Sequence, residues 1–155
     1  MKLSEMFRQP INKDDIMPVI RQGIFMSIVG GLLIGSIQLL FYYLFDFSFL
    51  WLMLIVFAHL LAKRVRNAYQ QYHLLYSIIS LFFFIFGYYL FNVSFYIGLF
   101  SLQTTLSLDQ ILYMMNPLLT FQFLNPFTSY FFGVNNLLDV IFFLIGSFYA
   151  FRYAK

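Results

Sequence analysis

The 155-residue chain is 62% hydrophobic and 10% charged, with a mean hydropathy of +0.82 and a formal net charge of +3. An ordinary soluble domain is roughly 45–50% apolar, so these side chains do not fit into one water-surrounded core, and a lipid bilayer suits them better. The lack of cysteine excludes disulfides, iron–sulfur clusters and thiolate chemistry. We therefore expect an all-α integral membrane protein, with residues 1–155 forming a single transmembrane domain.

Residues 1–17 are polar and mixed in charge, and the first apolar run follows them. We expect a first transmembrane helix over about 18–45, entered through Pro18, because proline is tolerated in the first turn of a helix. A tight turn at Asp46 then leads into a second helix over about 47–62. This helix has only about fourteen strongly apolar residues, so we expect Lys63 and Arg64 at its end to snorkel toward the membrane surface.

The third and fourth transmembrane helices are expected over about 74–97 and 129–151, with an external connection, 98–128, between them. The sequence SLDQ in this connection predicts a capping box, in which the Ser107 hydroxyl accepts from the Gln110 amide and the Gln110 side chain reaches back. The short helix that follows carries one apolar face, which is typical of an amphipathic helix on a membrane surface. Pro117 is expected to end it, and the remainder is either a re-entrant piece or a covering loop.

The distribution of bases predicts the topology. With four spans, all nine fall on one side: Lys2, Arg8, Lys13, Arg21, Lys63, Arg64, Arg66, Arg152 and Lys155. The other side carries only acids: Asp46, Asp109 and Asp139. The positive-inside rule then places both termini in the cytoplasm of a multi-pass cell-membrane protein. Lys63, Arg64 and Arg66 are expected to act as topology determinants, and anionic lipid heads are a further possible partner for them.

Two stripes of small residues predict close helix packing. Gly23, Ser27, Gly31 and Gly35 recur every four residues in the first span, and Gly146 and Ala150 do so in the fourth. Small residues at this spacing let helix backbones approach closely in lipid. The partner helix can belong to this chain or to another one, and we favour packing within the chain. Leu39, outside the stripe, is expected to face lipid.

Asp139 is the acid with the most informative position. Counting back from Arg152 at 1.5 Å per residue puts it roughly 20 Å from the cytoplasmic boundary of a hydrocarbon layer about 30 Å thick. Ionisable residues at depth are candidates for function. Alternatively, Asn136 caps a short fourth helix and Asp139 lies in its first turn as a partner of the helix dipole, which is the interpretation we favour.

His59 and His73 are the only histidines, and they are too far apart and too far from any carboxylate to form a metal site. We expect structural roles for both. The sequence predicts no cofactor and no metal.

The stretch NNLLDVIFFLIG at 135–146 loosely resembles the second motif of signal peptidase II, a four-span family with two aspartates that act on water near the outer surface. The likeness implies an aspartyl peptidase in which Asp139 is one of the acids. Leu138 stands where that family has a small residue, and the first motif has no counterpart around Asp109.

A second resemblance rests on three segments: RQGIFMSIVGGLLIG, AKRVRNAYQQYHLLYSIISLFFFIFGYYL and NNLLDVIFFLIGSFYAFRYAK. They are similar to a family of small four-span bacterial membrane proteins with a Gly-rich first span, a basic central loop and an A-[FY]-R ending. This resemblance implies bacterial origin and topology, and it implies no activity.

We expect a non-enzymatic function, as a structural or accessory subunit that packs against itself, in a homo-oligomer, or against a larger membrane complex. Membrane lipids are expected partners, and nucleic acid is not. The alternative is a small oligomeric transporter or pore, in which Asp139, Asn92, Asn135 and Asn136 line a polar path near the outer face. A peptidase like signal peptidase II is the more remote alternative.

Overall fold

A computed structural model describes residues 11–46 and 48–155, which are mostly helical and contain no strand. The expected all-α fold is confirmed for this part of the chain. The elements are α2 (Lys13–Phe25), the π-helical turn η1 (Met26–Gly30), α3 (Gly31–Phe45), α4 (Leu50–Arg66), α5 (Leu74–Ser101), α6 (Leu108–Met114), α7 (Pro117–Thr120), the 3₁₀ turn η2 (Gln122–Leu124) and α8 (Val134–Tyr153).

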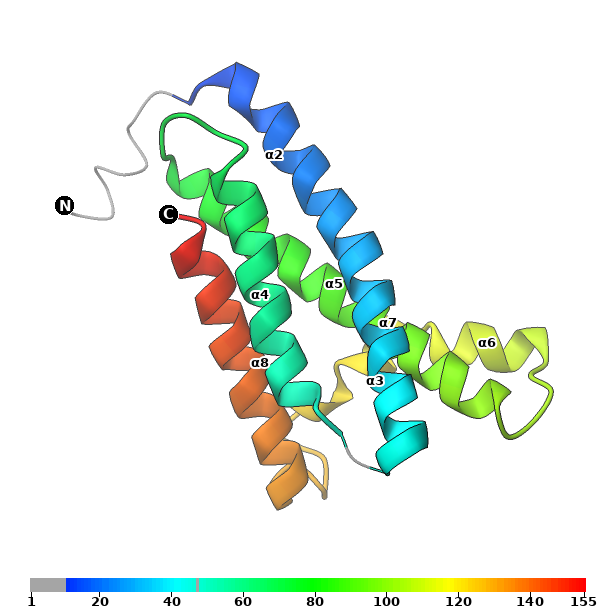
Figure 1. The fold of residues 1–155 in the computed structure, drawn as a ribbon. Helices are drawn as coiled ribbons and strands as arrows, with labels where there is room; N and C mark the ends of the chain where they lie inside the picture. The colour runs from blue at the N-terminus through cyan, green and yellow to red at the C-terminus, as the bar shows by residue number, and fades with distance from the viewer. Residues whose placement is uncertain (1–10, 47) are drawn as a thin grey trace.

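Within residues 11–46 and 48–155, three helices are long and apolar enough to cross a membrane: Lys13–Phe45, Leu74–Ser101 and Val134–Tyr153. The first combines α2, η1 and α3 into one continuous rod of 33 residues. Together with α4, the three form an elongated bundle, with the short elements α6 and α7 beside its lower half (Figure 1). At 17 residues, α4 is about 25 Å long, somewhat shorter than a hydrocarbon layer of about 30 Å.

The first helix begins earlier than the sequence suggested. The Asn12 side chain accepts a hydrogen bond from the Asp14 amide and caps α2, so helix formation starts at Lys13. Pro18 therefore lies inside the helix, beyond the first turn, and the expected entry through Pro18 is wrong. The missing proline N–H leaves one carbonyl near the helix start without its usual donor.

The helix ends around the external connection also differ from the expected limits. Helix α5 continues to Ser101, and α8 begins only at Val134. The connection between them is therefore 102–133, which we call the covering segment because of the position described below.

The small-residue stripe of the first helix lies against α5 of the same chain. A Cβ atom added to Gly31 would lie 2.7 Å from the Gly87 carbonyl oxygen, and one added to Gly35 would lie 2.7 Å from that of Phe91. Between Gly23 and Gly31, the Ser27 hydroxyl is within 2.8 Å of the carbonyl oxygens of Gly23 and Phe83. The two helix backbones are thus in contact over several turns, as small residues permit.

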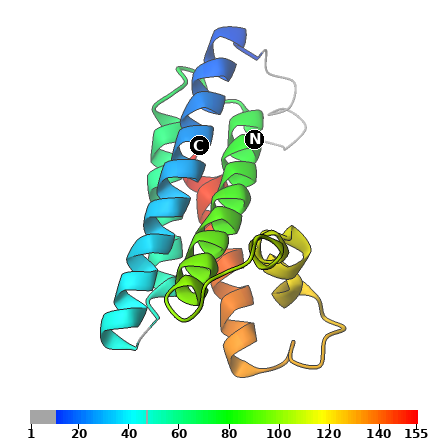
Figure 2. The ribbon, with the colours of Figure 1, turned by 90° about the vertical axis from the view of Figure 1, so that its right-hand side faces the viewer.

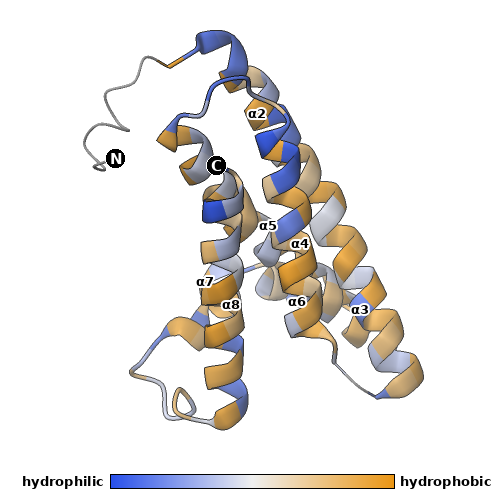
Figure 3. Cartoon of the chain, turned by 60° about the vertical axis from the view of Figure 1, so that its left-hand side comes forward, coloured by the Kyte–Doolittle hydropathy of each residue, from blue (hydrophilic) through white to orange (hydrophobic). Residues whose placement is uncertain are grey.

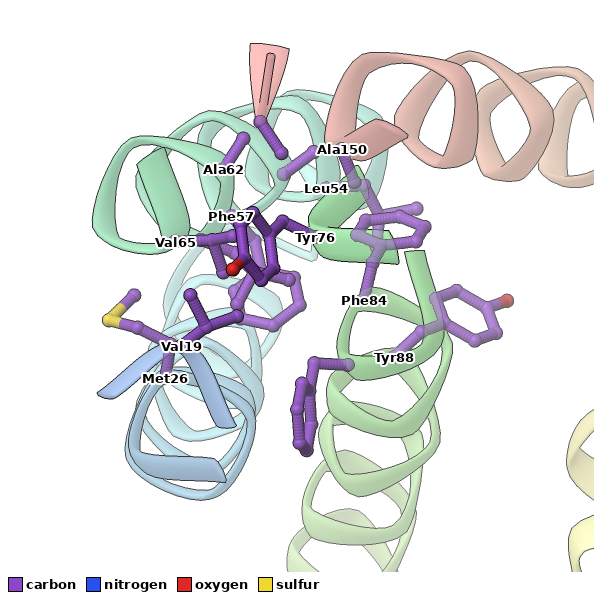
Figure 4. Packing of buried hydrophobic residues seen from close by; sticks show 14 of the residues in the cluster. Val19, Met26, Leu54, Phe57, Ala62, Val65, Tyr76, Phe84, Tyr88 and Ala150 are labelled. Atoms are coloured by element: carbon purple, nitrogen blue, oxygen red, sulfur yellow. The ribbon is translucent and has the colours of Figure 1, made fainter. Parts of the chain in front are cut away.

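Aromatic rings fill the space between α4, α5 and α8. Phe57 and Phe84 stack with ring centroids 5.8 Å apart, and Tyr76 is fully buried near them (Figure 4). The second stripe lies at this contact, because a Cβ on Gly146 would come within 2.6 Å of the Phe84 ring. The Ser80 hydroxyl donates to the Ala150 carbonyl oxygen at 2.8 Å, which fixes α8 on α5.

Replacing Gly31 with Ile should lower the free energy of unfolding in detergent by about 1–3 kcal/mol, the usual cost of overpacking a filled core. The nearest atom to the new side chain is the backbone oxygen of Gly87, which cannot rotate away. Denaturant titration of the purified protein, followed by circular dichroism, measures the loss.

The matched control is Leu33→Ile, because the Leu33 side chain is 56% exposed on the outside of the bundle. Leu39 does not serve, since it packs against Gly98, where an added Cβ would lie 2.4 Å from the leucine side chain. The expectation that Leu39 faces lipid is therefore wrong. An equal loss of stability at Gly31 and Leu33 would contradict the role given to the stripe.

Candidate binding cavity

A cavity of about 450 Å³ lies between the bundle and the covering segment, and we call it the Asp139 cavity. Helices α5 and α8 form one part of its wall, and α6, α7 and η2 form another. Figure 2 shows the covering segment curving beside these two helices. The polar side chains of the lining are Tyr88, Asn92, Tyr96, Tyr113, Thr120, Gln122, Tyr130, Asn136 and Asp139.

Helix α5 supplies a polar row to the cavity. Tyr88, Asn92 and Tyr96 follow one another at intervals of four residues, so they share one face of the helix. The Asn92 amide donates to the Tyr88 carbonyl oxygen at 2.9 Å. The Tyr88 ring contacts those of Phe123 and Phe143, which hold it in the cavity wall.

The expected capping box, within the covering segment, is confirmed. The Ser107 amide donates to Gln110 Oε1 at 2.9 Å, and the Gln110 amide donates to the Ser107 hydroxyl at 3.4 Å. Helix α6 ends at Met114, and Pro117 opens α7 as its first residue, with Asn116 as the cap. The Tyr89 hydroxyl donates to the Met115 carbonyl oxygen and ties this end of α6 to α5.

Helix α8 brings Asp139 to the cavity, but not in the way that the capping interpretation predicts. Its N-cap is Gly133, and Asn136 lies inside the first turn. The Asn136 amide donates to the carbonyl oxygens of Phe123 and Phe131, at 3.0 and 3.1 Å, so it pins the covering segment instead of capping the helix. Asp139 falls in the second turn, and its assignment as a first-turn dipole partner is wrong.

The Asp139 carboxylate is half-buried and has no hydrogen bond or ion pair with any residue in 11–46 or 48–155. It also lines an adjoining hollow together with Asn135 and Trp51. Asn92 and Asn136 thus line the same cavity as Asp139, whereas Asn135 lines only the adjoining hollow. Asp109 is exposed in the first turn of α6 and does not line the cavity, so the two acids are not paired there.

The middle of the bundle separates this cavity from the basic end of the molecule. Phe57, Phe84 and Tyr76 are at most 2% exposed and occupy that space. The cavity thus lies toward one end of the described bundle, away from the bases.

The basic triplet lies at the opposite end, in the last turn of α4. The Arg64 guanidinium stands 5.8 Å from the centre of the Phe25 ring, and that of Arg66 stands 4.9 Å from the Tyr69 ring. Lys63 is exposed beside them. These contacts leave the charged groups accessible at the bundle surface.

Neither histidine is part of the cavity. His73 Nδ1 accepts from the Leu75 amide at 3.0 Å and caps α5, while the exposed His59 contacts the rings of Tyr149 and Tyr153. No three His, Asp or Glu side chains of the described residues are grouped as metal ligands.

Sequence reasoning missed the tyrosines of the cavity. The spacing of Tyr88, Asn92 and Tyr96 within a Phe-rich span was a signal that could have found the α5 row. For Tyr113 and Tyr130 there was no such signal, because only the fold of the covering segment brings them to the cavity.

A single carboxylate among aromatic rings and amides can bind a cationic group. The negative faces of aromatic rings attract cations, and the carboxylate supplies the opposite charge. Comparisons of this chain with protein-family models, curated proteins and solved structures found no match. The resemblance to small four-span bacterial proteins therefore stays a prediction.

Replacing Asn136 with Leu should free the covering segment from α8 while leaving the bundle folded. We expect amide hydrogen exchange over 121–131 to become roughly tenfold faster, since each lost hydrogen bond weakens the closed state by about 1 kcal/mol. Exchange measured by mass spectrometry resolves this segment. Asn135→Leu is the matched control, because the neighbouring amide is exposed and makes no hydrogen bond with the described residues. Unchanged exchange in Asn136→Leu would rule out the pinning role.

Proposed function

We propose that the protein crosses a bacterial cell membrane four times, with both termini in the cytoplasm, and binds a small organic cation in the Asp139 cavity. The observation that carries the ligand class is the unpartnered Asp139 carboxylate in a cavity lined by four tyrosines.

The charge distribution supports the topology. The described bases lie at the end where α2 begins, α4 meets α5 and α8 finishes: Lys13, Arg21, Lys63, Arg64, Arg66, Arg152 and Lys155. Hydrophilic residues gather at this end in Figure 3 and recur at the start of α8. With four spans, α4 is the short one, and snorkelling of Lys63 compensates for its length. The apolar face of α6 then lies in the outer membrane interface.

Single-cysteine labelling tests this topology, and the cysteine-free chain provides a clean background. Cysteine at Gln110 should react with a membrane-impermeant maleimide added to intact cells, whereas cysteine at Asn67 should react only after lysis. Both side chains are exposed on the protein, so a difference in their labelling would come from the membrane alone. Labelling of Asn67→Cys in intact cells would overturn the proposed orientation.

The ligand class follows from the chemistry of the cavity wall. Recognition of quaternary ammonium groups by aromatic rings is a general use of cation–π attraction, and a carboxylate nearby adds a direct charge interaction. Asn92, Asn136 and Gln122 offer hydrogen bonds to polar substituents of the same ligand. About 450 Å³ falls within the usual volume range of sites for small molecules, roughly 300–1,000 Å³.

Choline and its uncharged isostere 3,3-dimethylbutan-1-ol test the charge requirement. In detergent, choline should bind the wild-type protein and the alcohol should not, as followed by fluorescence of Trp51, the sole tryptophan, which lines the adjoining hollow together with Asp139. Asp139→Asn should weaken choline binding roughly tenfold or more, the scale of one lost charged partner, without lowering thermal stability. The control Asp109→Asn removes the same charge outside the cavity and should bind as wild type.

Two other functions remain as alternatives. In the first, the protein is a structural or accessory subunit in a homo-oligomer or larger membrane complex, and the strongly exposed Leu118, Phe127 and Phe132 of the covering segment are part of the interface. A stoichiometric foreign protein retained in mild detergent, with no choline binding, would support this alternative. In the second, several copies form a transporter or pore, which would require choline flux into proteoliposomes in addition to binding.

A further inference from the structure

A second hollow, of about 410 Å³, lies at the basic end between α2 and α4. Its lining consists of Pro18, Arg21, Gln22, Arg64, Asn67 and Ala68. Two guanidinium groups from two helices thus border one space, together with two carboxamides. We call it the arginine hollow.

The charges in this hollow are not neutralised by the described residues. Neither Arg21 nor Arg64 forms an ion pair in 11–46 or 48–155, and Arg64 is positioned by the Phe25 ring instead. The nearby Asp15 does not line the hollow, and its carboxylate accepts from the Gln70 amide at 3.3 Å. Two like charges beside one space raise the local positive potential, so an anion placed between them is favoured.

One buried polar atom also lacks a partner here. Gln22 Oε1 is shielded from solvent and makes no hydrogen bond with the described residues. Because this oxygen is shielded, the polar groups open to a ligand in the hollow are the two guanidinium groups and the exposed Asn67 side chain. Carboxylates and phosphates both suit guanidinium groups, and a phosphate has enough oxygens to accept from two of them at once.

The outside of α2 beside the hollow is apolar and exposed. Met17, Ile24 and Phe25 are 71, 44 and 47% exposed, and they lie on either side of Arg21 in the sequence. In a membrane, this surface would face acyl chains while the arginines remain at headgroup level.

We propose that the arginine hollow is a binding site for the phosphate group of an anionic phospholipid, held by Arg21 and Arg64. Phosphatidylglycerol fits this site, since its headgroup carries a net negative charge and its acyl chains can lie on α2. Free inorganic phosphate shares the charge recognition but lacks the chains. The site is separate from the Asp139 cavity and does not depend on its ligand.

Native mass spectrometry of the full chain in detergent distinguishes the two sources. Phosphatidylglycerol should give a retained one-to-one adduct, and phosphatidylcholine, whose zwitterionic head lacks net charge, should be retained at least about tenfold more weakly. Arg21→Gln and Arg64→Gln should each reduce retention of phosphatidylglycerol about tenfold, the scale of one lost charge-assisted contact. The control Lys63→Gln removes an adjacent charge that does not line the hollow and should bind as wild type.

Added inorganic phosphate completes the experiment. If millimolar phosphate displaces the lipid from the wild-type protein, the site takes free phosphate as well. If phosphate does not displace the lipid, binding requires the acyl chains. Both results support a phosphate site. Equal losses in Lys63→Gln and Arg64→Gln, with all variants folded by circular dichroism, would overturn the proposal, because the attraction would then be a diffuse effect of surface charge. Equal retention of phosphatidylglycerol and phosphatidylcholine would also overturn it.

Discussion

The close approach of the first helix to α5 is the constraint on which the rest of the structure depends. At Gly31 and Gly35 even a methyl group would meet backbone oxygen, so no larger residue fits without moving a helix. Because lipid is as apolar as a leucine side chain, burial alone gives little drive for helices to associate, and close packing with interhelical hydrogen bonds must supply it. The Ser27 hydroxyl adds such a bond to the Phe83 carbonyl oxygen, within the π-helical turn. This contact positions α5, which in turn carries both the aromatic core and the polar row of the cavity.

Side-chain hydrogen bonds to backbone carbonyls hold the remaining elements around α5. Ser80 bonds to Ala150 in α8, Tyr89 bonds to Met115 after α6, and Asn136 reaches Phe123 and Phe131. The loop between α4 and α5 follows the same rule, since the buried Tyr69 hydroxyl donates to the Ala154 carbonyl oxygen. Burial raises the pKa of Tyr69 to about 12, so this phenol stays a donor through the physiological range. In an apolar surrounding, each such bond also removes the cost of an unpaired carbonyl.

The role of a residue was predictable from the sequence where it depends on near neighbours in the chain. It was not predictable where the partners of the residue come from distant segments. The helical class, the stripe of small residues and the capping box at Ser107 follow from spacing and composition alone. Asn136 was assigned as a cap because asparagine near a helix start usually caps, yet its partners come from the covering segment, which no local pattern places. The same holds for Leu39, whose neighbour Gly98 is known only from the packing of α3 on α5. The tyrosines of the cavity are visible in the sequence, but only the fold shows which of them lie close together.

The two candidate sites have opposite charge and lie at opposite ends of one filled core. Phe57, Phe84 and Tyr76 fill the space between them in the described bundle, so the two sites are separate. An acid at one end and arginines at the other would also agree with the proposed orientation, in which positive charge marks the cytoplasmic side. The residues that set orientation would then double as ligand groups: Arg64 belongs both to the basic triplet and to the arginine hollow. Such a double role fits a chain with only 10% charged residues, most of which, among the described ones, lie near helix ends.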